Sequence, residues 1–169
     1  MQVVLENEAL KVTINSFGAE LASIQGKATD TEYLWNADAK FWKRTAPVLF
    51  PFVGSLKNKE YHYEGKTYSM GQHGFARDME FAVDVQTATE AWFSLQSNEE
   101  TKAKFPLEFI LKIGYELEGK ELKVIWQVEN PDTKTLYFSI GGHPAFMCPV
   151  DEKGKQSEYY FKFDTDKDL

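Results

Sequence analysis

The sequence predicts an antiparallel β-sandwich, and three features of its 169 residues lead to that prediction. Apolar and polar residues alternate with a period of two along most of the chain, which is typical of strands that bury one face. Short glycine-containing segments separate these runs at the spacing of β-hairpins. Only one short segment carries a helix start signal. Many short antiparallel strands are therefore expected, with little helix.

The first half of the chain contains two alternating segments and one hairpin. Residues 10–14 and 79–86 each place apolar side chains at every second position. Between them, the turn 64–66 contains a glycine, which closes tight turns through its positive φ. This turn predicts a hairpin with strands at 61–63 and 67–70.

The second half contains the longest alternating segments. Residues 107–115 and 122–128 predict two long strands, and the glycine-containing segment 118–120 predicts the hairpin turn that joins them. The segment 130–132 has the Asn-Pro-Asp composition of a turn. A further strand is therefore expected at 136–140.

The single helix signal lies between the strands of the second half. Ser97 and Glu100 have the spacing of a capping box, and Pro106 stops whatever follows. We expect a connector of about two turns within residues 97–105.

Composition narrows the function classes. The 19 Lys and Arg against 26 Asp and Glu give a net charge of −7, which disfavours nucleic acid and anionic membrane as partners. No apolar run is long enough to span a bilayer, and the start of the chain lacks the basic and apolar regions of a signal peptide. The single cysteine, Cys148, cannot form an internal disulfide, which fits a reducing compartment. We therefore expect a cytoplasmic protein.

The three histidines differ in their surroundings. His62 lies between two tyrosines on a predicted strand and is expected to be structural. His73 and His143 are flanked by glycines at the ends of predicted strands, where close approach of a ligand is possible. Two such histidines without an HxxxH or CxxC pair do not predict a metal site. Cys148 lies among apolar neighbours, so a buried inert thiol is expected rather than a nucleophile.

The segment 41–54 is apolar and interrupted by two prolines, so it is expected to cross the core irregularly. Arg44 lies near its start, beside Trp42. An aromatic face with a guanidinium suits a sugar, whose C–H face stacks and whose hydroxyls accept hydrogen bonds. Core packing with Arg44 in an ordinary ion pair is an equally good interpretation of this segment alone.

Three motifs together resemble the aldose 1-epimerase superfamily and, within it, the LacX-like branch. They are RTAPVLFPFVG at 44–54, QHGFAR at 72–77 and GGHPAF at 141–146. The resemblance implies a galactose mutarotase-like β-sandwich that binds a sugar in a cleft on one sheet. It further implies an isomerase that opens and recloses the sugar ring without a metal or cofactor.

The same resemblance implies a role for four residues. His143 matches the acid that protonates the ring oxygen, and His73 matches the histidine that holds the sugar oxygens. Arg44 and Arg77 match substrate-contacting positions. A near-neutral imidazole suits proton donation at operating pH, and arginine suits hydroxyls or a phosphate.

One expected element has no counterpart in this sequence. In the family, the base is a glutamate well past the second histidine motif, and here only Glu152 and Glu158 lie nearby, outside any matching motif. We therefore predict that residues 1–169 are the N-terminal portion of a single mutarotase-like sandwich domain, incomplete on its C-terminal side and with exposed strand edges.

The three motifs and the resemblance that they carry lead to two expected functions. The first is interconversion of the α and β anomers of an aldohexose or hexose 6-phosphate, with low activity in the 169-residue piece alone. The alternative is a non-catalytic carbohydrate-binding or regulatory module of the same fold. Both take a small-molecule sugar or sugar phosphate as partner.

Overall fold

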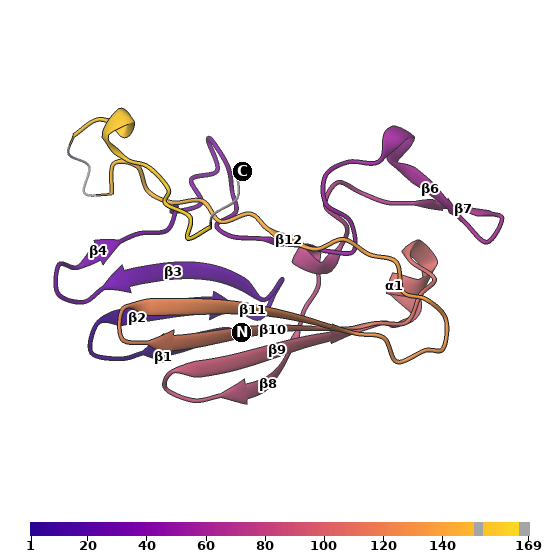
Figure 1. The fold of residues 1–169 in the computed structure, drawn as a ribbon, viewed down its shortest axis with the longest axis horizontal. Helices are drawn as coiled ribbons and strands as arrows, with labels where there is room; N and C mark the ends of the chain where they lie inside the picture. Colours follow the sequence, from indigo (N-terminus) through magenta and orange to yellow (C-terminus); the bar gives the residue numbers. More distant parts are fainter. Residues whose placement is uncertain (151–153, 166–169) are drawn as a thin grey trace.

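The computed structural model describes residues 1–150 and 154–165 and consists mainly of two antiparallel four-stranded sheets. Figure 1 shows them stacked, with the hairpin of β10 and β11 lying across β1 and β2. The first sheet has the order β1-β2-β3-β4, and its strands are Gln2–Glu6, Leu10–Asn15, Glu20–Gly26 and Thr31–Glu32. The second has the order β11-β10-β9-β8, and these strands are Glu121–Glu129, Ile110–Glu118, Glu90–Gln96 and Ala82–Gln86. The predicted antiparallel β-sandwich is confirmed.

The core lies between the two sheets and follows the alternation of the sequence. On β10, Leu111, Ile113 and Tyr115 are at most 1% exposed, and they join the cluster that contains Val12 and Ile14 of β2. Burial raises the pKa of Tyr115, with the charge of Glu20 adding to the effect. The neutral hydroxyl donates a hydrogen bond of 2.7 Å to the carbonyl oxygen of Ala19, so this buried polar group is satisfied.

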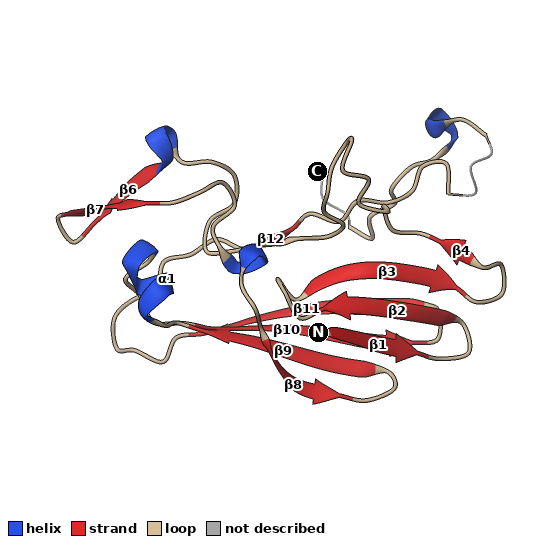
Figure 2. Ribbon diagram, turned by 180° about the vertical axis from the view of Figure 1, so that it is seen from behind, coloured by secondary structure: helices blue, strands red, loops and turns tan. Residues whose placement is uncertain are grey.

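Two small ladders lie on one side of the sandwich. β5, Val48–Leu49, pairs with β12, Gly141–Gly142, and β6, Glu60–Tyr63, pairs with β7, Lys66–Ser69. The hairpin predicted around 64–66 is therefore confirmed. In Figure 2, β6 and β7 belong to one lobe above the sheets, and the turn Gln156–Glu158 belongs to another, with β12 between them. Short 3-10 turns complete the connections at Lys57–Lys59, Ala76–Asp78 and Gln156–Glu158.

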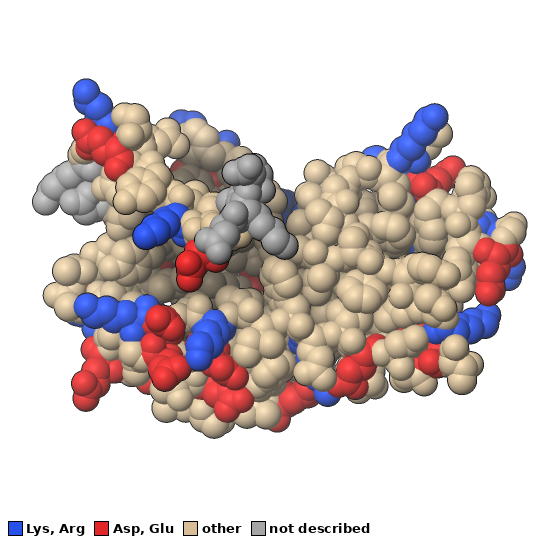
Figure 3. Space-filling model, viewed as in Figure 1, with Lys and Arg blue, Asp and Glu red and all other residues tan. Residues whose placement is uncertain are grey.

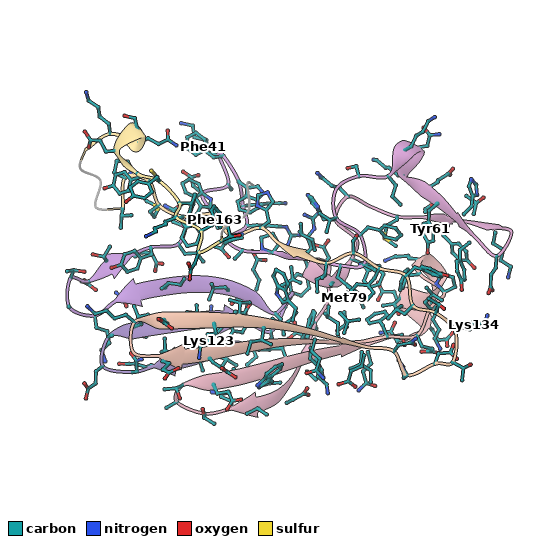
Figure 4. The ribbon with its side chains drawn as sticks, in the orientation of Figure 1. Phe41, Tyr61, Met79, Lys123, Lys134 and Phe163 are labelled. Carbon is teal, nitrogen blue, oxygen red and sulfur yellow. The ribbon has the colours of Figure 1, made fainter. Side chains whose placement is uncertain are left out.

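The segment 41–54 crosses the interior irregularly only from residue 45 onward, because Phe41 is 71% exposed and residues 42–44 are exposed or half-buried. Residues 45–51 are buried, yet only Val48 and Leu49 form a strand. Figure 4 shows side chains between the sheets and the lobe that contains β6 and β7, with Met79 near the point where that lobe meets the sheets.

The one α-helix, α1, spans Glu99–Lys104, inside the predicted range. Its cap differs from the prediction. Asn98, not Ser97, accepts a hydrogen bond from the backbone N–H of Thr101, and the Thr101 hydroxyl in turn accepts from the N–H of Asn98. Asn is a strong N-cap residue. The capping box therefore lies one residue further along the chain than predicted, with Asn98 and Thr101 in the places expected for Ser97 and Glu100.

Three strand predictions need correction. Residues 136–140 are extended but form no ladder, because their one backbone bond to a neighbouring segment among the described residues runs from the N–H of Ser139 to the carbonyl oxygen of Pro51. The Ser139 hydroxyl also accepts from the N–H of Val53. β8 begins at Ala82 rather than at 79, after Phe81 has bonded to Ser16 outside the ladder. The strand predicted at 107–115 begins only at Ile110 and continues to Glu118.

The β10–β11 hairpin is confirmed, with Gly119 at φ 55° in its turn, but β11 is less covered than β10. Val124 and Trp126 lie opposite the buried Tyr115 and Ile113, and yet they are 44% and 42% exposed. Within the described residues, β11 pairs with β10 alone. It is therefore an exposed edge strand. Within residues 1–150 and 154–165, every helix is too short or too polar to cross a lipid bilayer.

Candidate active site

His73 lies in a loop that is fastened to the segment around Gly54 by two hydrogen bonds. The N–H of His73 donates to the carbonyl oxygen of Gly54 at 2.8 Å, and the N–H of Gly54 donates to Nδ1 of His73 at 3.0 Å. The second bond fixes the neutral tautomer, because Nδ1 must accept and the proton must then sit on Nε2. His73 has φ 66°, in the left-handed region that histidine tolerates better than most residues.

The next residue, Gly74, explains why a glycine follows this histidine. It has φ 73°, and a Cβ there would lie 2.1 Å from the carbonyl oxygen of Phe50. That oxygen also accepts hydrogen bonds from the N–H groups of Phe75 and Ala76, at 3.0 and 3.1 Å. The loop therefore packs backbone against backbone, and only glycine fits at this contact.

The backbone of His143 is held by the ladder of β5 and β12. It follows the β12 glycines, and its N–H donates to the carbonyl oxygen of Pro47 at 3.1 Å, just before β5. A Cβ on Gly142 would lie 2.9 Å from Cζ2 of Trp126. The side chain of His143 is exposed, and among the described residues neither of its ring nitrogens has a hydrogen-bond partner.

The structure brings the two predicted histidines together although 70 positions separate them in the sequence. Their ring centroids are 6.2 Å apart at 64°, and the indole of Trp42 lies 5.0 Å from the ring of His143. Figure 3 shows a notch between the two upper lobes, in the region where Figure 1 shows β12. In Figure 4, Phe41 and Phe163 belong to the lobe on one side of this notch and Tyr61 to the lobe on the other.

Arg44 and Arg77 lie beside each other next to the histidines. Nη1 of Arg44 donates to the carbonyl oxygen of Arg77 at 3.2 Å, and Nη2 donates to the carboxylate of Asp78. Nη1 also lies 3.5 Å from Oε2 of Glu20. Arg77 donates from Nη2 to the carbonyl oxygen of Gln72 at 2.9 Å, within the loop that carries His73. The two arginines thus tie the loop to the start of the 44–54 segment.

The charge in this network is compensated. The two guanidinium groups face two carboxylates, those of Glu20 and Asp78, since Nε of Arg77 lies 3.7 Å from Oδ2 of Asp78. Nε of Arg77 is buried and makes no hydrogen bond among the described residues. In Figure 3, charged side chains of both signs mix along the lower part of the molecule, without a continuous basic surface.

The two histidines differ in their electrostatic surroundings and in their hydrogen bonds. Burial lowers the pKa of His73, and the neighbouring charges of Arg77 and His143 lower it further. A neutral His73 with its proton on Nε2 is a fixed hydrogen-bond donor. Among residues 1–150 and 154–165, neither ring nitrogen of His143 has a hydrogen-bond partner, so both are open to a ligand.

The remaining candidate residues lie elsewhere or differ from expectation. His62 is exposed on β6, where Nδ1 lies 2.9 Å from Oγ1 of Thr67, as suits a structural strand histidine. Cys148 is exposed, so the prediction of a buried thiol is wrong: the stretch around it runs along the surface, with Phe146 itself 39% exposed. Glu158 accepts from the N–H of Lys155 in its own turn, and Glu152 lies outside the described residues. Residues 1–150 and 154–165 contain no group of three or more His, Cys, Asp or Glu side chains arranged to hold a metal.

Two residues of this site carry no role in the prediction from sequence. Trp42 is noted there only as an aromatic neighbour of Arg44, and its contact with His143 depends on the tertiary structure. Glu20 is 8% exposed and bonds to the segment after Arg44. Its signal in the sequence is a carboxylate between the apolar residues Ala19 and Leu21, at the start of an alternating run.

Comparison with known proteins agrees with this architecture. The family model for aldose 1-epimerase matches residues 1–169. The chromosomal LacX protein of Lactococcus lactis subsp. lactis is 37% identical, over 96% of this chain and 56% of LacX. A galactose mutarotase related enzyme from Lactobacillus acidophilus is 43% identical, with a TM-score of 0.89 over 92% of this chain and 52% of that one.

A second solved structure, a galactose mutarotase-like protein from Lactobacillus casei, is 42% identical, with a TM-score of 0.84 over 86% of this chain and 50% of that one. The chain thus spans about half the length of the relatives that it matches. With the match over its whole length and the shared sandwich, the chain belongs to the aldose 1-epimerase family.

Proposed function

We propose that this chain supplies the sugar-binding and proton-donating part of an aldose 1-epimerase active site whose substrate is an aldohexose. The observation that carries the proposal is the placement of His73 and His143, with ring centroids 6.2 Å apart. One is fixed as a donor, and the other has no hydrogen-bond partner among the described residues. We propose further that residues 1–169 correspond to the N-terminal portion of a single sandwich domain, as it occurs in the longer relatives.

The proposed reaction opens and recloses the sugar ring. A base accepts the proton of the anomeric hydroxyl, the bond between C1 and the ring oxygen breaks, and protonated His143 gives its proton to that oxygen. Rotation about C1–C2 and the reverse steps deliver the other anomer. His73 donates from Nε2 to a sugar oxygen and holds the ring in place. No residue of this chain is assigned the role of base.

The charge balance favours an aldohexose over its 6-phosphate. Arg44 and Arg77 are both engaged with carboxylates, so the site offers little net positive charge to a phosphate dianion. Their remaining N–H donors suit neutral hydroxyl oxygens.

Polarimetry tests the reaction. We expect the 169-residue chain to leave the relaxation of freshly dissolved α-D-glucose or α-D-galactose close to the buffer rate, since it offers an acid without an assigned base. A chimera that adds the C-terminal part of the Lactobacillus acidophilus relative, of which this chain covers 52%, should accelerate relaxation. In that chimera, His143→Ala should reduce the acceleration by a factor of about 10²–10⁴. His62→Ala is the control, because this histidine lies outside the site, and it should change the rate little.

The same experiment separates the two candidate functions. A chimera that binds sugar but does not accelerate relaxation would favour the non-catalytic carbohydrate-binding module. Tighter binding of glucose 6-phosphate than of glucose would contradict the preference for the neutral sugar.

A further inference from the structure

Glu20, the first residue of β3, is a buried carboxylate with an unusually full set of partners. It is 8% exposed. Its Oε1 accepts from the backbone N–H of Thr45 at 2.8 Å and from the N–H of Ala46 at 3.0 Å. The hydroxyl of Thr45 lies 3.1 Å from the same oxygen and shares its one proton with the carbonyl oxygen of Leu21. A charge taken out of water is destabilising unless it is paired and hydrogen-bonded, so these contacts account for its presence in the interior.

The segment that Glu20 holds at Thr45 and Ala46 also holds the His143 segment, through Thr45 and Pro47. The carbonyl oxygen of Thr45 accepts from the N–H of Ala145 at 2.8 Å, and that of Pro47 accepts from the N–H of His143 at 3.1 Å. β5 then pairs with β12 over only two residues on each strand. A ladder this short gives His143 little support of its own. The two bonds from residues 45 and 47 are therefore the contacts nearest the imidazole that hold its backbone, while Tyr33 and Trp35 hold the segment further along.

The second oxygen of Glu20 points to the other half of the site. Oε2 lies 3.5 Å from Nη1 of Arg44, and the same guanidinium bonds to the carbonyl oxygen of Arg77 and to Asp78. Those residues end the loop that carries His73. One buried side chain is therefore connected to both histidine segments, through backbone bonds on one side and through Arg44 on the other.

We propose that Glu20 is a positioning residue that sets the place of His143 by holding the backbone of Thr45 and Ala46. It does not touch the space beside the imidazoles, and it acts through the 45–47 segment. Its importance for the chemistry depends on the function proposed above, but its effect on the position of His143 does not.

Amide hydrogen exchange of the 169-residue chain, followed residue by residue by NMR without sugar, tests this coupling. Glu20→Ala should speed exchange of the His143 amide by about tenfold or more, because its acceptor Pro47 loses its support, while the amides in the centre of β10 stay within about twofold. Glu20→Gln keeps an oxygen for both N–H donors and loses only the ion pair to Arg44. It should leave the His143 amide within about threefold of the wild type.

Glu32 is the matched control. It lies on β4 of the same sheet, and its Oε1 likewise accepts from two backbone N–H groups, those of Ile24 and Leu34, each at 2.9 Å. Glu32→Ala should speed exchange of those two amides. Residues 33–35 bond to Ala145 and Met147 but not to His143, so the His143 amide should change much less than in Glu20→Ala. If Glu20→Ala does not fold, Glu20→Asp, which keeps the charge but withdraws it by one methylene, should show the same selective increase at His143.

Two results would overturn the proposal. One is faster exchange at Thr45 and Ala46 with the His143 amide unchanged, which would confine Glu20 to its own turn. The other is an equal increase throughout β10, which would make Glu20 a general stabilising residue. Because the readout needs no sugar, neither result bears on whether the chain binds or isomerises one.

Discussion

The two segments that carry His73 and His143 meet at one site but are built differently. The His73 loop is fastened at several points: two bonds to Gly54, two N–H groups on the carbonyl oxygen of Phe50, and a glycine that packs on that same oxygen. The His143 segment is held less closely at the histidine itself, by the two-residue ladder before it and by one N–H bond to Pro47, and its side chain is exposed. Its other bonds lie further along, where Ala145 bonds to Thr45 and Trp35 and Met147 bonds to Tyr33. Rigidity suits a histidine that must present one fixed N–H, and freedom suits a histidine that must take up and release a proton.

The largest test of this contrast is Gly74→Ala. The added Cβ would meet the carbonyl oxygen of Phe50 at 2.1 Å in a residue with φ 73°, so the loop must move. We expect a loss of about 3 kcal/mol or more in the free energy of unfolding, measured by urea denaturation.

Gly65→Ala is the matched control for this substitution. Gly65 has a similar φ of 75° in the β6–β7 turn, but no atom lies within 4 Å of the added Cβ. It should cost only about 1 kcal/mol, the price of the left-handed conformation. Equal costs for the two variants would mean that the His73 loop is not packed against Phe50 in solution.

The corresponding change on the other segment, Gly142→Ala, should be milder. Its Cβ would meet Cζ2 of Trp126 at 2.9 Å, but that indole is 42% exposed and can turn aside. We expect a cost of about 1 kcal/mol in the same urea experiment. A cost as large as that of Gly74→Ala would contradict the view that the His143 segment is the adjustable one.

The smallest expected effect is on the pH dependence of stability. The pKa of His73 is lowered in the folded protein by burial and by Arg77, so the unfolded chain binds a proton at this residue more readily. The stability of the folded state should therefore decrease as pH falls below about 6.5, the ordinary pKa of histidine. The contribution is absent above that pH, where His73 is neutral in both states.

His73→Asn isolates this contribution. Asparagine tolerates a positive φ and can accept the Gly54 bond through its side-chain oxygen, but it does not titrate. Urea denaturation between pH 7.5 and 5 should show a shallower decrease for the variant than for the wild type. Parallel curves would mean that His73 does not resist protonation.

The sequence predicts well what depends on local pattern. The alternation along β10 corresponds to buried side chains because each apolar position faces one continuous core, and the glycines beside His73 and His143 mark backbones that other groups approach closely. The hairpin turns at 64–66 and 118–120 are correct for the same local reason.

The errors concern features that depend on distant neighbours. Residues 136–140 have the composition of a strand, but a strand requires a partner, and only Ser139 finds one. Cys148 has apolar neighbours in sequence, yet that stretch lies on the surface. The roles of Glu20 and Trp42 could not be predicted either, because each acts on a segment that the chain reaches much later.

The central claim is that His73 and His143 together form the sugar site of this chain. The most direct test is an NMR titration of the 169-residue chain with D-galactose and D-glucose that follows the Cε1–H signals of its three histidines. We predict that sugar moves the signals of His73 and His143 in a saturable manner, with one shared dissociation constant, and leaves that of His62 in place. Saturable binding that moves neither His73 nor His143, or that moves His62 alone, would contradict the claim.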